Sequence, residues 1–207
     1  MKKPSPAQLS LFRKYLEEFI TFSSDEWDVF QDLLSLKVLE KKSFFVEAGQ
    51  VCSEVGFIIQ GSVRYVHRKD GEEITAYFSL DEEMVSAYKS FLTQQPALVS
   101  IEAIETTTMI IITHHDLHLL FDDPRVNFKI ERFGRLIAES LICCYEDRVF
   151  SFVVRTPEER YLDLMKNHKK VFQRVPQHYI ANYLGITPVS LSRIRKRILA
   201  SLNIHQI

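Results

Sequence analysis

The sequence predicts an α+β protein in which a β-rich N-terminal region is joined by one long helix to a small basic region of short helices. Three observations predict this fold class. Short runs of β-branched and aromatic residues fill positions 42–113, an apolar repeat of helical period follows them, and basic residues gather near the C-terminus. We place the domain boundaries at 1–121 for the β-rich region with its N-terminal helices, 122–150 for the long helix and 151–207 for the basic region.

Two amphipathic helices are expected before the strands. Apolar residues recur at helical spacing within 6–20, and Ser23 followed by Glu26 is a capping box that opens a second helix. The apolar period then changes to that of strands, with turn signals such as Asp70-Gly71 between the runs. Several short strands at this spacing predict an antiparallel sandwich or barrel.

A long helix is expected after the Asp-Asp-Pro break at residues 122–124. Its apolar residues recur at spacings of four and three, which is the a/d pattern of a helix-packing seam. Because the apolar face is broad, the helix could instead lie on its own domain. The same broad face could also pack on its own domain and on a partner helix at once. We expect a homodimer joined through this seam, to which we assign Val126, Ile130, Phe133, Ile137, Ser140 and Cys144.

Charge divides the chain into two parts. Residues 151–207 carry ten lysines and arginines against three acidic residues, a net charge of +7, so residues 1–150 carry −8. A basic C-terminal region on an acidic body is typical of a polyanion-binding module attached to a second domain. No apolar run is long enough to cross a bilayer and the start lacks a signal-peptide pattern, so we expect a cytoplasmic protein without a membrane partner.

The stretch LGITPVSLSRIRKRI, residues 184–198, has the features of a helix-turn-helix. Gly185 can take a positive φ in the turn, Thr187-Pro188 can cap the second helix, and Ala181 is small enough for a close approach of the two helices. We expect the outer face of the second helix to meet DNA, although a solvated basic face on a core helix would carry the same charges. The residues that we assign to DNA are Thr187, Pro188, Val189, Ser190, Ser192, Arg193, Arg195, Lys196 and Arg197.

The side chains of this outer face can make specific contacts with double-stranded DNA. Arg193 can pair bidentately with guanine, Ser192 can donate or accept a hydrogen bond, and Val189 can touch a thymine methyl group. The basic residues 195–197 are better placed for phosphates, which position a protein without reading sequence.

The chain also resembles a known family. The C-terminal domain of this family is matched here by TPEER followed by YIANYLGITPVSLSRIRKRI. The family's cyclic-nucleotide-binding β-roll is similar to the stretch FFVEAGQVCSEVGFIIQGSVRYVHRKDGEEITAYF. This family is the Crp/Fnr group of bacterial transcription regulators, and the resemblance is greatest to those of Bacteroidetes-like bacteria. It runs from about Asp25 to Leu199. The β-hairpin wing of many relatives is expected to be absent or vestigial here, because the sequence ends at Ile207.

The resemblance implies a β-roll and a homodimer joined through the long helix. It also implies a double-stranded DNA target in the form of an inverted repeat, with half-sites about 34 Å apart. RNA polymerase would be a further partner.

The same resemblance bears on cyclic nucleotides. Family members that bind cyclic AMP grip the ribose with the glutamate of a Gly-Glu pair and neutralise the phosphate with the arginine of an Arg-Ser/Thr pair. Here these pairs fall on Ser86-Ala87 and Ala97-Leu98, which carry neither group. We therefore predict a roll that is kept as a scaffold without cyclic-nucleotide binding.

The identity of any other effector is left open. An unknown small molecule could bind the roll, or its own side chains could fill it. The candidates for an effector pocket are Ser86, Ala87, Tyr88, Lys89, Ser90, Phe91, Ala97 and Leu98.

Other site chemistries have little support in the sequence. His114, His115 and His118 are possible metal ligands, but we expect them to be polar surface residues at a strand-to-helix transition, because no carboxylate-rich pair follows nearby. Three cysteines without a CxxC pair fit neither a disulfide framework, a zinc site nor an iron–sulfur cluster. We predict no metal, no cofactor and no catalytic residue. The alternative to a DNA-binding regulator is a ligand-binding or protein-interaction module whose C-terminal domain no longer reads DNA.

Overall fold

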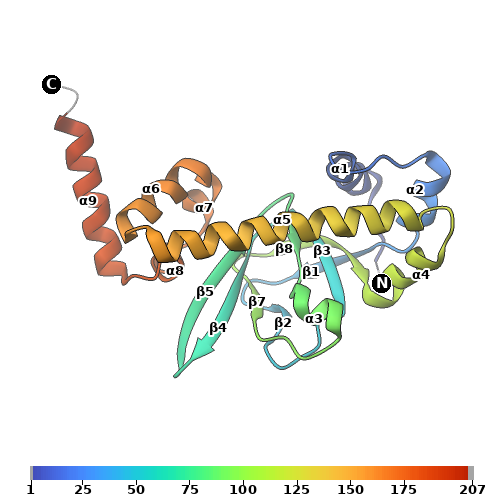
Figure 1. Cartoon of the computed structure of the whole chain (residues 1–207), viewed down its shortest axis with the longest axis horizontal. Helices are drawn as coiled ribbons and strands as arrows, with labels where there is room; N and C mark the ends of the chain where they lie inside the picture. Colours follow the sequence, from blue (N-terminus) through green and yellow to red (C-terminus); the bar gives the residue numbers. More distant parts are fainter. Residues whose placement is uncertain (1, 205–207) are drawn as a thin grey trace.

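A single long helix spans most of the molecule and links its two ends (Figure 1). The computed structural model describes residues 2–204, with side chains described to residue 200. The strands lie along one side of the long helix, the N-terminal helices lie near its start, and four helices gather at its far end. The predicted α+β class is confirmed.

Two capped helices come first, as the sequence predicts: α1 (Pro6–Glu17) and α2 (Ser24–Gln31). At α2 the Ser23 hydroxyl accepts from the Glu26 amide at 3.3 Å, and the Glu26 carboxylate accepts from the Ser23 amide at 2.6 Å. These reciprocal bonds satisfy two backbone donors that the start of a helix leaves free, which explains why α2 begins where it does.

Eight strands form two antiparallel sheets, one in the order β1-β8-β3-β6 and the other in the order β2-β7-β4-β5. The two-residue turn between β4 and β5 is Asp70-Gly71, and both residues have positive φ, as this kind of hairpin requires. A short helix, α3 (Tyr88–Thr93), lies between β6 and β7. The strands are β1 (Ser35–Leu39), β2 (Phe44–Val46), β3 (Glu54–Gln60), β4 (Val63–Lys69), β5 (Glu72–Ser79), β6 (Met84–Val85), β7 (Ser100–Ala103) and β8 (Thr107–Thr113).

The core between the sheets follows from strand alternation. Ile58 and Met109 point into the cluster between the two sheets, whereas their neighbours Phe57 and Ile110 point to the opposite face of the first sheet. That opposite face is covered by α1, α2 and the helices that follow β8. We call residues 35–113 with these two sheets the roll.

The second half of the chain is helical. A helix α4 (His114–Asp122) leads into the long helix α5 (Asn127–Val154), which is 28 residues long. The predicted boundary at residue 150 therefore falls inside α5, which ends only at the extended residue Arg155. The C-terminal unit, as we call residues 156–204, contains α6 (Pro157–Asn167), α7 (Lys169–Arg174), α8 (Gln177–Tyr183) and α9 (Pro188–Ile204).

Substitution of Gly61 tests a close approach inside the roll. Gly61 has a φ of +127°, and a Cβ atom there would lie 2.5 Å from the Thr107 Cα. We expect Gly61→Ala to lower the free energy of unfolding by about 3 kcal/mol or more. The substitution forces an alanine to a positive φ and also presses its Cβ atom against the backbone of Thr107.

Gly71→Ala is the matched control, because Gly71 has a φ of +83° with no atom within 4 Å of the added Cβ. It should cost only about 1 kcal/mol. Urea unfolding measures both variants, and equal losses would contradict the close approach.

Candidate nucleic-acid interface

The turn between α8 and α9 has the geometry that the sequence predicts. Gly185 has a φ of +70°; its amide donates to the Asn182 carbonyl at 3.0 Å, and the Ile186 amide donates to the Ala181 carbonyl at 3.0 Å. These two bonds form a Schellman motif, which ends a helix with a left-handed residue and suits glycine. The motif sets the direction in which the chain leaves α8.

The start of α9 is capped by the residue that the sequence indicates. The Thr187 hydroxyl accepts from the Ser190 amide at 3.1 Å, and Pro188 is the first helical residue. A proline is tolerated there because its missing amide would have no partner inside the helix. The cap fixes where α9 begins relative to the turn.

The inner faces of α8 and α9 pack on one apolar cluster. Ile180 and Ala181 are fully buried, and residues of α6, α7 and the roll complete the cluster. This packing fixes the rotation of α9 about its axis. The buried residues that α8, the turn and α9 contribute are Tyr179, Ile180, Ala181, Leu184, Leu191, Ile194 and Ile198.

The outer face of α9 carries the residues that we assign to DNA. All nine are exposed except Ser190, which is half-buried. Arg195 donates to the Gln177 side chain at 2.8 Å, and Arg197 pairs with Glu158 at 2.7 Å. Neither Arg193 nor Lys196 has a side-chain partner among the described residues, so their charges face solvent.

Two arginines that the sequence reading did not single out hold this arrangement together. Arg160 of α6 donates to the Leu184 carbonyl at 2.9 Å and to the Arg155 carbonyl at 2.7 Å. Arg148 of α5 donates to the Tyr183 carbonyl at 2.7 Å. Burial lowers the pKa of the Arg148 guanidinium, which still remains charged at physiological pH. No local pattern marks either residue for this role, because the Leu184 and Tyr183 carbonyls lie 24 and 35 positions further along the chain than Arg160 and Arg148.

Comparison with known proteins places these features in a family of folds. Residues 36–123 match the family model of the cyclic nucleotide-binding domain. FixK2 from Bradyrhizobium japonicum superposes with a TM-score of 0.66 at 16% identity, over 81% of this chain and 85% of FixK2. The chain has the Crp/Fnr fold.

Two further structures of this type agree. The c-di-GMP responsive global regulator CLP from Xanthomonas campestris gives a TM-score of 0.65 at 15% identity, over 84% of this chain and 90% of CLP. A Crp/Fnr transcriptional regulator from Eubacterium rectale gives 0.62 at 17% identity, over 87% of this chain and 85% of that one. No curated protein sequence matches the chain. The predicted resemblance is thus confirmed at the level of the fold.

The long helix of this Crp/Fnr fold presents a different face from the one that the sequence analysis assigns to a seam. Val126 and Ile130 are 1% and 2% exposed and pack in the cluster formed by α1, α2 and the first sheet, with Phe133 against the same cluster. Phe133, Ile137 and the rest of the assigned seam become more exposed along the helix, and Ser140 and Cys144 are at the surface. The first half of this seam therefore belongs to the chain's own core.

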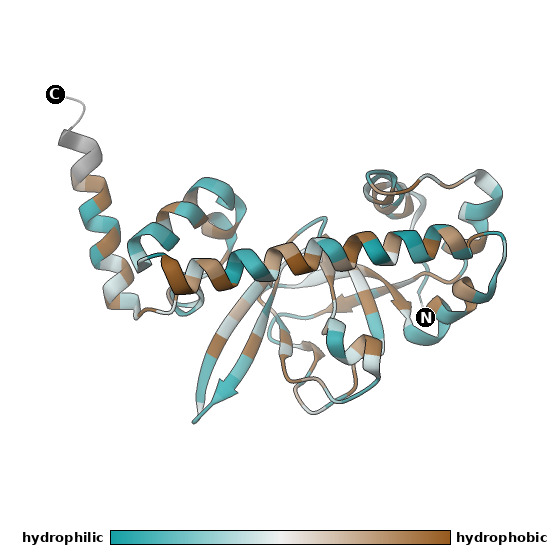
Figure 2. Ribbon diagram, viewed as in Figure 1, coloured by the Kyte–Doolittle hydropathy of each residue, from teal (hydrophilic) through white to brown (hydrophobic). Residues whose placement is uncertain are grey.

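Another apolar stripe on α5 is open to solvent. Ile142, Tyr145 and Val149 are 59%, 68% and 63% exposed, and they follow one another at spacings of three and four. At about 100° per residue, Val149 is rotated roughly 100° from Ile130, so it lies on a different side of the helix from the residue packed in the core. Brown segments along the middle and far end of α5 mark its apolar residues in Figure 2. We call Ala138, Ile142, Tyr145 and Val149 the outer stripe. The next residue at this spacing, Phe152, lies beside Gly185 and the Arg160 guanidinium.

The candidates for an effector pocket divide into core and surface. Ala87, Ser90, Phe91 and Ala97 are buried, whereas Leu98 is 72% exposed. Lys89 is also exposed, and Ser86 and Tyr88 are half-buried. The structure thus brings part of the set together inside the roll and leaves Lys89 and Leu98 outside it.

The serine hydroxyl groups among these candidates are already bonded to the chain. Ser86 donates to the Glu54 carbonyl at 3.1 Å, and Ser90 accepts from the Cys52 amide at 2.9 Å. Phe91 and the two alanines pack in the cluster between the sheets. These contacts favour the alternative in which the roll is filled by its own side chains.

The histidines after β8 form a pair rather than a metal cluster. The Nε2 atoms of His114 and His118 lie 3.2 Å apart on α4. Among the described residues, no group of three or more histidine, cysteine or acidic side chains could hold a metal ion. Within the same part of the chain, no helix is long and apolar enough to span a membrane.

Proposed function

We propose that this chain is a sequence-specific DNA-binding transcription regulator of the Crp/Fnr type. The observation that carries the proposal is the outer face of α9, where Arg193 and Lys196 project from a helix whose position is fixed by a Schellman turn and a buried inner face. Two free cationic side chains on a rigid, convex helix suit the major groove, where arginine pairs with guanine. The proposal involves no catalysis, and RNA polymerase as a partner stays a prediction.

We propose further that the regulator is a homodimer joined through the outer stripe of α5. The stripe has the heptad spacing of a helix pair, and its central residues lose contact with water only if another surface covers them. An inverted repeat is the DNA target that a two-fold symmetric pair of recognition helices would read. This seam replaces the one that the sequence predicts, because the latter is partly buried in the chain's own core.

We propose finally that cyclic AMP does not control this regulator. The positions at which relatives carry the ribose-binding glutamate and the phosphate-binding arginine are Ala87 and Ala97, two buried methyl groups. A cyclic phosphate placed there would have no fixed cation to neutralise it, which makes its desolvation unfavourable.

Substitutions on α9 test the DNA-binding proposal. Selection from a random double-stranded library with the wild-type protein should give an inverted repeat. Arg193→Ala should then lose about 1–3 kcal/mol of discrimination at one base position per half-site, whereas Lys196→Ala should weaken binding to all sequences alike. Fluorescence anisotropy against single-base variants of the repeat measures both.

Two results would contradict the assignment. If Arg193→Ala weakens every sequence equally, Arg193 is not a base reader. If the wild-type protein selects no sequence at all, the C-terminal unit does not read DNA and the interaction-module alternative takes its place.

A charge in the outer stripe tests the homodimer. Sedimentation velocity should find the wild-type protein dimeric, and Val149→Glu should weaken the dimer about tenfold or more, since it buries a carboxylate in an apolar seam. Val154→Glu is the matched control: Val154 is also exposed on α5 but lies roughly 140° away around the helix. Equal effects of the two variants, or a monomeric wild type, would rule out this seam.

Calorimetry tests the independence from cyclic nucleotides. Titration of cyclic AMP or cyclic GMP into the protein should produce no binding heat at ligand concentrations up to about 1 mM, for want of a phosphate-binding cation. A regulator known to bind cyclic AMP serves as the positive control. Micromolar affinity for either nucleotide would disprove the prediction.

A further inference from the structure

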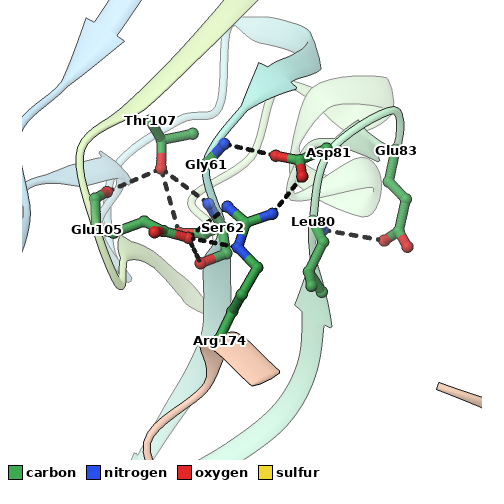
Figure 3. A network of polar contacts seen from close by, with 8 residues as sticks. All are labelled: Gly61, Ser62, Leu80, Asp81, Glu83, Glu105, Thr107 and Arg174. Carbon is green, nitrogen blue, oxygen red and sulfur yellow. Dashed lines mark hydrogen bonds and ion pairs between the residues drawn. The ribbon is translucent and has the colours of Figure 1, made fainter. Parts of the chain in front are cut away.

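The C-terminal unit is held against the roll by an arginine that reaches two separate loops. Arg174, the last residue of α7, pairs with Asp81, which follows β5, and with Glu105, which lies between β7 and β8. Its Nε donates to the Glu105 carboxylate at 3.1 Å. Figure 3 shows the guanidinium between the two carboxylates. One side chain of the helical unit thus contacts two turns of the roll.

The two carboxylates are themselves fixed by the roll. Asp81 accepts from the Gly61 amide at 2.7 Å, and Glu105 accepts from the Ser62 hydroxyl at 2.6 Å (Figure 3). The Thr107 hydroxyl donates to the Glu105 carbonyl at 2.9 Å. Because these partners belong to the roll, the carboxylates are held by contacts that do not depend on Arg174. Preorganised acceptors and a planar guanidinium make an ion pair with a defined geometry.

A second contact joins α8 to the free edge of β5. The Asn182 side chain donates to the Glu73 carbonyl at 2.7 Å and accepts from the Thr75 amide. Since β5 is the last strand of its sheet, these backbone groups would otherwise face solvent. Asn182 therefore takes the place of a neighbouring strand at this point.

A third contact stacks an arginine of the roll on the same helix. The guanidinium carbon of Arg64 lies 3.9 Å from the centroid of the Tyr179 ring. The Arg64 side chain is 4% exposed and pairs with Glu102 and Glu73. Phe78, Leu80 and Ile104 of the roll also belong to the apolar cluster of the C-terminal unit. The interface between the roll and the C-terminal unit therefore combines ion pairs and hydrogen bonds with apolar contacts, and it extends across α7 and α8.

These contacts have a geometric consequence. A single extended residue, Arg155, joins α5 to the cap of α6, so the covalent link alone leaves the C-terminal unit free to swivel. In a dimer joined through α5, any swivel would change the distance and the angle between the two α9 helices. That distance decides which spacing of half-sites the dimer can bind.

We propose that Arg174, together with Asn182, positions the recognition helices and thereby sets the half-site spacing that the dimer accepts. Both residues lie in the C-terminal unit, away from the outer face of α9, and act by holding α7 and α8 on the roll. This inference rests on the proposed function, because it takes the DNA-binding homodimer as given. It concerns the geometry of the same site rather than a contact with DNA.

The first readout needs no DNA. The Thr75 amide donates to Asn182, so its hydrogen exchange, followed by NMR, reports whether α8 is docked on β5. Arg174→Gln should speed exchange at Thr75 about tenfold or more relative to amides buried between the sheets. Lys169→Gln is the control, since Lys169 is an exposed lysine of the same helix with no side-chain partner among the described residues.

Glu105→Gln keeps the inference testable if Arg174→Gln folds poorly. It removes the charge from the roll side and should also speed exchange at Thr75. In the double variant the two effects should not add, because both substitutions break the same ion pair. Additive effects, or exchange at Thr75 no faster than in Lys169→Gln, would overturn the inference while leaving the proposed function intact.

The second readout is the choice of spacing. Binding is measured to inverted repeats whose half-sites are moved apart one base pair at a time, and to an isolated half-site. The wild-type protein should prefer one spacing about tenfold or more over its neighbours, and Arg174→Gln should reduce that preference to about threefold with little change at the isolated half-site. An unchanged spacing preference would overturn the inference. Failure of the wild-type protein to bind any repeat would overturn the proposed function, and the spacing role with it.

Discussion

The packing of the first half of α5 on the chain's own core is the constraint on which the rest of the structure depends. Val126 and Ile130 are almost completely buried among the N-terminal helices and the first sheet. The ring of Phe133 packs edge-on against the ring of Phe19, with 5.7 Å between the ring centroids. A continuous helix transmits its rotation from one end to the other, since each residue advances it by about 100°. The buried first half therefore decides that Val149 faces outward and that Arg148 lies beside the turn that precedes α9.

The distribution of charge on α9 follows from the packing of its neighbours. Arg195 and Arg197 lie within reach of Gln177 and Glu158, so part of their hydrogen-bonding capacity is used inside the C-terminal unit. Arg193 and Lys196 are exposed, and neither has a side-chain partner in the part of the chain that the structure describes. The exposed hydrogen bond of Arg195 and the exposed ion pair of Arg197 contribute little to stability, so phosphates can compete for both arginines at low cost. The free pair is better suited to direct contact with DNA.

The roll carries side chains that hold the C-terminal unit in place. Ala87 and Ala97 are buried in its core, whereas Arg64, Asp81 and Glu105 are directed at the C-terminal unit. A buried arginine such as Arg64 is costly to leave unpaired, and Glu102 and Glu73 prevent that cost. A buried ion pair of this kind contributes little net stability, because the desolvation of the two charges offsets their attraction.

The sequence by itself determined the local features of this protein. The α+β class, the capping box at Ser23, the hairpin turn at Asp70-Gly71 and the glycine turn at Gly185 each depend on a few adjacent residues whose backbone preferences are strong. The exposed face of α9 also followed from apolar spacing, because burial of one face of a helix leaves the other face to solvent.

Only the tertiary structure decided which face of α5 remains open and which arginines hold the domains together. Both faces of α5 carry apolar residues at heptad spacing, so periodicity could not tell a core-packing face from an outer one. Arg174 meets Asp81 across 93 positions, and Asn182 meets Glu73 across 109. Contacts between residues so far apart in the chain depend on how whole elements pack, and no local pattern in the sequence records that packing.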